Sequence, residues 1–226
     1  SYRCMKITCT TENLRTAVHT AERFTGRHVT LPILSHILCK ADEKKISLIA
    51  TNLEFGIEYH LAGKVQKPGV VTIPAKPISQ LLGSIHDETV TIEAKSQHLA
   101  LHTPTTDVTI LGLDPGDFPT LPVIKREHTF AIPALDFVSG LQRVTPAAAV
   151  SDLKPELAGV LFALSPGSLT LAATDSFRLA EQKITLRESG GQRAECIVPI
   201  RTAQEVMRIL PPEPNVDVRV SIGEHQ

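Results

Sequence analysis

The chain lacks the features that mark a secreted or membrane-spanning protein. No apolar run reaches the roughly 18 residues that a transmembrane helix needs. The opening residues 1–6 have no apolar stretch of the kind found in a signal peptide, and Met5 is a candidate start. We therefore expect a cytoplasmic protein without membrane association.

Metal-binding spacings are also missing. The four cysteines form no Cys-x-x-Cys pair and have no histidine at zinc-ligand spacing, and no His-x-x-x-His falls in a helical pattern. In a cytosolic protein, Cys4, Cys9, Cys39 and Cys196 are expected to be free, buried thiols. We predict no structural metal and no cofactor.

The chain has no excess of positive charge. Its 23 basic and 24 acidic residues give a net charge of −1. Because nonspecific DNA affinity comes mostly from neutralising phosphates, this balance argues against a protein that holds DNA by charge alone. It leaves room for a local basic surface that is balanced by acidic residues elsewhere.

What the chain does contain is an internal repeat. Residues 34–53 and 157–175 each predict two strands joined by a short polar turn, and each closes on Ala-Thr followed by Asn or Asp. Thr51 and Thr174, the threonines of these closing motifs, are 123 residues apart. An ordered match at one offset indicates two copies of a single folding unit.

Each copy is expected to contain two helices. One follows Pro74 or Pro199, which are 125 residues apart, and has apolar residues at i, i+3, i+4 and i+7. The other begins near Thr10 or Thr11 in the first copy and at Pro133 in the second. With the alternating strands around them, these patterns predict an α+β fold of duplicated domains, each with two helices packed on antiparallel sheets.

A segment rich in proline, glycine and aspartate separates the copies. Residues 113–122 exclude a helix and predict an ordered linker, which Phe118 anchors against a core. We place one domain at 1–122 and the other at 123–226. Strands predicted at 99–102 and 107–111 have no counterpart in the second copy, so we expect an incomplete second domain with an exposed sheet edge, and hence a fragment.

Several short segments resemble a known family, the bacterial DNA polymerase III beta subunit or beta sliding clamp. Those that resemble its first domain are TLPIL at 30–34, ATNLE at 50–54, IPAK at 73–76 and DFP at 117–119. Those that resemble its second domain are ATDSFRLA at 173–180 and IVP at 197–199. The resemblance covers essentially the whole chain in the right order.

The resemblance implies the DNA clamp fold and a ring. In that family, each subunit has three such domains, and two subunits form a homodimer around double-stranded DNA, with helices lining the hole. This chain carries two of those domains, the second without its end, and the third domain is absent. We therefore expect that the chain alone does not close the usual ring.

A sliding ring needs weak contacts to DNA phosphates that ignore sequence. The candidate DNA-facing residues are basic and lie on or beside the predicted helices: Arg15, Arg23, Arg27, His28, Lys76 and Arg201. Lys76 and Arg201 occupy equivalent places at two helix starts, where a cation opposes the helix dipole, so their recurrence suggests a role beyond stability. The alternative for each residue is an ordinary solvated surface.

The resemblance also implies a pocket on the second domain for short linear peptides of DNA polymerase III, other polymerases, the clamp loader and repair proteins. The residues carried over by position are Leu157, Thr174, Ser176, Phe177, Arg178 and Leu179. The family often has Gly-His where this chain has Ser176-Phe177. The alternative is that Leu157, Phe177 and Leu179 fill the core. Because the rest of the pocket would follow Gln226, we expect this chain to bind such peptides weakly or not at all.

A third surface is implied at the end of the first domain. Residues 107–110 alternate in polarity and, by the resemblance, form the edge that pairs with another subunit. Val108 and Ile110 are the candidates for this dimer edge, and plain core packing is the alternative.

Two other kinds of function compete with the clamp. An enzyme is disfavoured because residues 112–116 lack the Lys-Ser/Thr of a phosphate-binding loop, and no nucleophile lies near a base. Asp175 aligns with Asn52 in the other copy, so we interpret both as residues that cap a turn. The remaining alternative is a two-domain peptide-binding module that does not encircle DNA.

Overall fold

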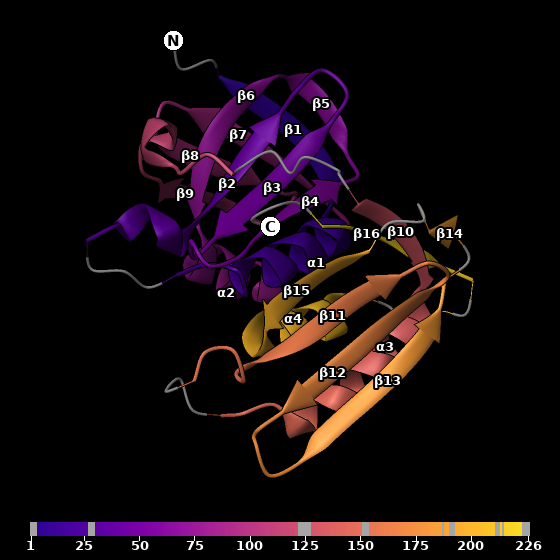
Figure 1. Ribbon diagram of the computed structural model, residues 1–226. Helices are drawn as coiled ribbons and strands as arrows, with labels where there is room; N and C mark the ends of the chain where they lie inside the picture. The colour runs from indigo at the N-terminus through magenta and orange to yellow at the C-terminus, as the bar shows by residue number, and fades with distance from the viewer. Residues whose placement is uncertain are drawn as a thin grey trace. The chain divides into compact units, whose positions relative to one another are not determined.

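The computed structural model describes residues 4–26, 30–121, 128–150, 154–186, 188–189, 193–210, 213 and 215–222 (Figure 1). The chain divides into two compact units, residues 1–121 (unit 1) and 122–226 (unit 2), and each is described by itself. No helix of the described part is long and apolar enough to cross a membrane.

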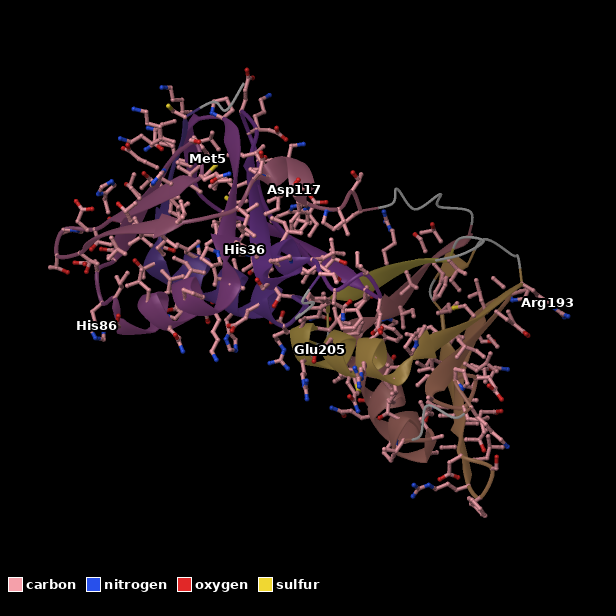
Figure 2. The ribbon with its side chains drawn as sticks, turned by 90° about the vertical axis from the view of Figure 1, so that its left-hand side faces the viewer. Met5, His36, His86, Asp117, Arg193 and Glu205 are labelled. Atoms are coloured by element: carbon pink, nitrogen blue, oxygen red, sulfur yellow. The ribbon has the colours of Figure 1, made fainter. Side chains whose placement is uncertain are left out.

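Unit 1 contains two antiparallel sheets. Sheet A has the strand order β5-β1-β7-β8-β9, and sheet B has the order β4-β3-β2-β6. The strands are β1 (Met5–Thr10), β2 (His36–Ala41), β3 (Ile46–Thr51), β4 (Gly56–Leu61), β5 (Lys64–Lys67), β6 (Gly69–Pro74), β7 (Thr89–Lys95), β8 (His98–His102) and β9 (Asp107–Leu111). Figure 2 shows Met5 among these strands, and its side chain is buried.

Two helices of unit 1 pack against each other, α1 (Thr11–Glu22) and α2 (Ala75–Ser84) (Figure 1). Thr10 caps α1, because its hydroxyl accepts a hydrogen bond from the Asn13 N–H at 3.2 Å. The apolar face of α1 is buried as its periodicity predicts, and α1 also contacts sheet B. A short 3-10 helix, η1 (Pro32–Ser35), leads into β2.

Unit 2 is built in the same way. Its sheets have the orders β14-β10-β16 (sheet C) and β13-β12-β11-β15 (sheet D). The strands are β10 (His128–Pro133), β11 (Gly159–Ser165), β12 (Ser168–Thr174), β13 (Leu179–Thr185), β14 (Glu188–Ser189), β15 (Ala194–Pro199) and β16 (Asp217–Ile222). The helices are α3 (Ala134–Val144) and α4 (Ile200–Ile209), which pack against each other, and the 3-10 helix η3 (Thr145–Ala147). Pro133 is the N-cap of α3, one residue before the helix, so the predicted start was one residue early.

The two units repeat one topology, which confirms the internal repeat. Sheets B and D have the same strand order, and β10 and β16 pair as β1 and β7 do. In sheet B, His36 pairs with Pro74, and in sheet D, Gly159 pairs with Pro199 at the equivalent place. Within the described residues, β16 is an edge strand of sheet C, with β10 as its single neighbour.

The segment after β9 folds back onto the outer face of sheet B. The Thr72 hydroxyl donates to the Leu113 carbonyl at 2.6 Å and accepts from the Leu113 N–H at 2.7 Å. Phe118 is buried against Ile33 and Leu34, which confirms its predicted role as an anchor. The segment also forms one 3-10 turn, η2 (Pro115–Asp117), where no helical structure was predicted; Asp117 marks it in Figure 2.

Candidate functional site

The closing motifs of the two repeats form the same hydrogen-bonded turn. The Asn52 side chain accepts from backbone N–H groups two and three residues later, at 3.0 and 2.9 Å, and Asp175 does the same at 3.0 Å for both. The hydroxyls of Thr51 and Thr174 each accept from the N–H two residues later and donate to the carbonyl four residues later. This confirms that Asn52 and Asp175 cap a turn.

In unit 2 the turn carries an additional ion pair. The Arg178 guanidinium donates from Nε to the second carboxylate oxygen of Asp175 at 2.9 Å. Hydrogen bonds from the backbone N–H groups of Phe177 and Arg178, together with this guanidinium, hold the pKa of Asp175 below its usual range. Ser176 lies in the left-handed region at φ +76°, as Leu53 does at +75°, so the turn holds a backbone conformation that L-residues rarely adopt.

Replacing Asp175 by alanine is expected to loosen this turn, whereas asparagine should keep it, because Asn52 supports the same turn in unit 1. Because the pKa of Asp175 is lower in the folded chain, its carboxylate contributes fully to the stability of the turn at a pH above 3.8, the ordinary pKa of aspartate. This contribution is lost as the pH falls through the lower pKa of the folded state. Amide chemical shifts of Phe177 and Arg178, followed from pH 7 downwards while the chain stays folded, measure this. They should titrate in the wild type and not in Asp175→Asn. An asparagine variant that behaves like the alanine variant would contradict the prediction.

The apolar residues beside this turn are accessible. Phe177 is 97% exposed and Leu179 71% exposed, so the alternative that they fill the core is wrong. Leu157, which precedes β11, is half-buried and does not belong to the buried core cluster of unit 2. Thr174 is half-buried, and Ser176 and Arg178 are exposed. The six predicted pocket residues therefore lie at one end of sheet D and the approach to it.

The equivalent surface of unit 1 is closed by the chain itself. Leu34 and Thr51, the counterparts of Leu157 and Thr174, are 0% and 4% exposed. Phe118 packs on Leu34, and the Leu121 side chain lies within 3.1 Å of the place where a Cβ on Gly56 would be. The two repeats thus differ in how accessible this surface is. Among the described residues, it is buried in unit 1 and open in unit 2.

The basic residues assigned to DNA occupy different settings. Lys76 and Arg201 are exposed and are each the second residue of a helix, α2 and α4. Arg23 is exposed at the end of α1, and Arg27 and His28 lie outside the described residues.

Arg15 has a structural role that the sequence did not reveal. Its guanidinium donates to the carbonyls of Leu82 at 3.1 Å and Ile85 at 2.8 Å, and it pairs with Glu12. These carbonyls lie at the C-terminal end of α2, where the last carbonyls of a helix receive no hydrogen bond from N–H groups of the same helix. Arg15 therefore ties α1 to α2, and much of its hydrogen-bonding capacity is already used.

The predicted dimer edge lies on β9, the last strand of sheet A. Val108 and Ile110 are half-buried and pair with Leu101 and Leu99, so they are neither fully packed nor fully exposed. Leu111, which the sequence analysis did not single out, is 63% exposed at the end of the same strand.

Unit 2 also has an apolar cavity of about 340 Å³, away from the pocket residues. It is lined by side chains of α3, α4, β11, β15 and β16, among them Phe137, Phe162, Val206 and Val220. In unit 1, β8 lies beside β7 and places Leu99 and Leu101, both fully buried, on the corresponding side of the sheet. Apart from β10, the described residues of unit 2 place no strand beside β16 that could supply such side chains.

The described residues offer little for metal or thiol chemistry. They contain no group of three or more His, Cys, Asp or Glu placed to hold a metal ion. Burial raises the pKa of the Cys9 thiol to about 11 and that of Cys39 to about 12, so both stay protonated and unreactive at neutral pH. All four cysteines are free, but Cys4 is exposed and Cys196 half-buried, so the expectation of burial was wrong for them.

Comparison with known proteins gives matches along almost the whole chain. Residues 5–122 match the family model of the DNA polymerase III beta subunit, N-terminal domain, and residues 131–226 match that of its central domain. The beta sliding clamp of a Synechocystis strain is 28% identical over 95% of this chain and 60% of its own length. That of Synechococcus elongatus is 29% identical over 79% of this chain and 48% of its own length.

Solved structures show the same likeness. A putative DNA polymerase III beta subunit from Eubacterium rectale superposes with a TM-score of 0.91 at 25% identity, over 97% of this chain and 60% of that one. The sliding clamp of Pseudomonas aeruginosa bound to griselimycin gives a TM-score of 0.90 at 26% identity, with the same coverage. The chain therefore spans about 60% of these structures and shares their α+β clamp fold.

Proposed function

Because the chain belongs to the family of the DNA polymerase III beta subunit, we propose that it forms part of a cytoplasmic, non-catalytic sliding clamp that encircles duplex DNA. The observation that carries the proposal is the match of two adjacent family domains, in order, to residues 5–122 and 131–226. In this proposal a homodimeric ring tethers DNA polymerase III, other polymerases, the clamp loader and repair proteins through short peptides.

A ring that holds DNA by topology needs mobility more than affinity. Weak contacts to phosphates allow sliding, which suits a chain with a net charge of −1 better than a strongly basic one. We assign these contacts first to Lys76 and Arg201, which are exposed at the same position of two repeat-related helices. Arg15 is a weaker candidate because its guanidinium is held by α2.

Charge reversal tests the DNA-facing assignment. Lys76→Glu combined with Arg201→Glu in the native gene product is expected to reduce clamp loading and processive primer extension on circular DNA several-fold. The matched control is Lys44→Glu with Lys183→Glu, which makes the same charge change at exposed positions on a β2–β3 turn and on β13. Unchanged loading in the helix variant, or an equal loss in the control, would contradict the assignment.

The native mass of the gene product separates the ring from the competing function. A dimer of three-domain subunits supports the clamp. A two-domain monomer supports instead a peptide-binding module that does not encircle DNA.

The partner site needs its own test. Griselimycin is bound to the Pseudomonas aeruginosa clamp, and we propose that it occupies the partner site of this protein and can serve as a probe for it. Calorimetric titration of the native product should show binding that Phe177→Asp weakens. An undiminished affinity in the variant would remove Phe177 and its neighbours from the site.

A further inference from the structure

The aromatic ring of Phe177 is exposed to solvent. At 97%, its exposure is the highest among the exposed large apolar side chains of the described residues. The fold does not require an aromatic residue here, because the same turn in unit 1 has Glu54 at the equivalent position. An apolar side chain that the fold neither buries nor needs is typical of an interaction surface.

The polar side chains of the turn are already engaged within it. The Thr174 hydroxyl accepts from one backbone N–H and donates to one carbonyl. One Asp175 oxygen accepts from the N–H groups of Phe177 and Arg178, and the other accepts from the Arg178 guanidinium. The capping groups therefore offer a partner little new hydrogen bonding, and the ring of Phe177 remains as the main contact surface.

The apolar surface continues from the turn onto sheet D. Leu179, the first residue of β13, pairs with Thr174 and is 71% exposed. On β15, Ile197 is 49% exposed and pairs with the half-buried Leu161 of β11. In unit 1 the corresponding face is covered by the chain's own residues 113–118, a segment with one 3-10 turn whose apolar anchors are Leu113 and Phe118. The first repeat thus shows that a short segment with large apolar anchors suits this kind of sheet face.

We infer that Phe177 determines specificity at the proposed peptide site, by selecting partner peptides that carry a large apolar side chain, with an aromatic ring preferred, where they face it. The inference rests on the proposed function and adds the chemistry of the ligand. Burial of one large apolar side chain against the ring is worth a roughly ten- to hundredfold gain in affinity. Edge-to-face or offset stacking adds to this for an aromatic partner.

The test is selection of a random hexapeptide library, displayed in many copies on phage, against three forms of the native gene product. Multivalent display compensates for weak single-site affinity. The forms are the wild type, Phe177→Glu, and Phe177→Glu combined with Glu54→Phe, which moves the exposed ring to the same turn of the closed unit. Phe177 is almost fully exposed, so equal unfolding midpoints of the three forms are expected and provide the folding control.

The wild type is expected to enrich peptides with an aromatic or large aliphatic residue at one fixed position, and Phe177→Glu should lose that preference. A soluble peptide of the selected sequence should bind Phe177→Glu roughly ten- to hundredfold more weakly. The double variant should not regain the preference, because Leu34 and Thr51, the unit 1 counterparts of Leu157 and Thr174, are buried.

Other outcomes overturn the inference in distinguishable ways. The same consensus on wild type and Phe177→Glu would reject the role of Phe177 while leaving peptide binding intact. Recovery in the double variant would mean that any exposed phenylalanine suffices. No enrichment on any form would count against peptide binding by this chain, and the inference would fail with it.

Discussion

Replacing Gly112 by alanine is expected to destabilise unit 1 by about 3 kcal/mol or more. A Cβ at this position would lie 2.2 Å from the backbone oxygen of Thr72 and 2.9 Å from its hydroxyl. The backbone has little room to retreat, because the Gly112 N–H donates to the Gln97 carbonyl at 2.8 Å. The next residue, Leu113, makes two hydrogen bonds with the same Thr72 hydroxyl. Relief of the clash therefore requires the loss of several hydrogen bonds.

A matched control is available in the same unit. Gly83 lies in α2, and a Cβ there would meet nothing within 4 Å. Gly83→Ala should stabilise unit 1 by about 0.5–1 kcal/mol, since alanine favours the helix. The chain has no tryptophan, and its two tyrosines, Tyr2 and Tyr59, both belong to unit 1. Tyrosine fluorescence during urea unfolding thus reports on this unit, and equal midpoints for Gly112→Ala and wild type would show the prediction to be wrong.

The sequence predicted the features that depend on local chemistry. Thr10 at the start of α1 and the capping roles of Asn52 and Asp175 were predictable, because side-chain oxygens there satisfy nearby backbone N–H groups. The helices were predictable from their apolar periodicity. The start of α3 was misplaced by one residue because proline is favoured at the first helical position, whereas Pro133 lies one residue before the helix.

Features set by distant contacts were not predictable. The need for glycine at position 112 comes from Thr72, on a strand 40 residues earlier. Arg15 was predicted to lie on or beside a helix, but its bonds to the end of α2 arise because the fold brings residues 82 and 85 beside it. The exposure of Phe177 was left open because residue type alone does not say which side of a turn faces solvent.

The contrast between Phe118 and Phe177 yields the second large prediction. Phe118→Ala is expected to lower the free energy of unfolding by about 3–5 kcal/mol. Removal of a buried ring loses the free energy gained by transferring it out of water and also leaves a cavity. Phe177→Ala, the same substitution at a side chain that is 97% exposed, should change stability by less than about 0.5 kcal/mol. Urea unfolding of both variants, followed by circular dichroism and by tyrosine fluorescence, measures the difference.

Loss of the Phe118 anchor has a functional consequence as well. Leu34 and Thr51 lie beneath the segment that Phe118 holds, and they are the counterparts of Leu157 and Thr174 in the open site of unit 2. Phe118→Ala should therefore expose apolar surface on unit 1, seen as increased binding of the dye ANS under conditions where the chain remains folded. Unchanged ANS binding together with a small loss of stability would mean that the segment holds without its ring. An increase in ANS binding would show that the Phe118 ring keeps this surface closed. The two repeats share a strand order and a turn, so this one aromatic anchor would then explain why the surface is buried in unit 1 and accessible in unit 2.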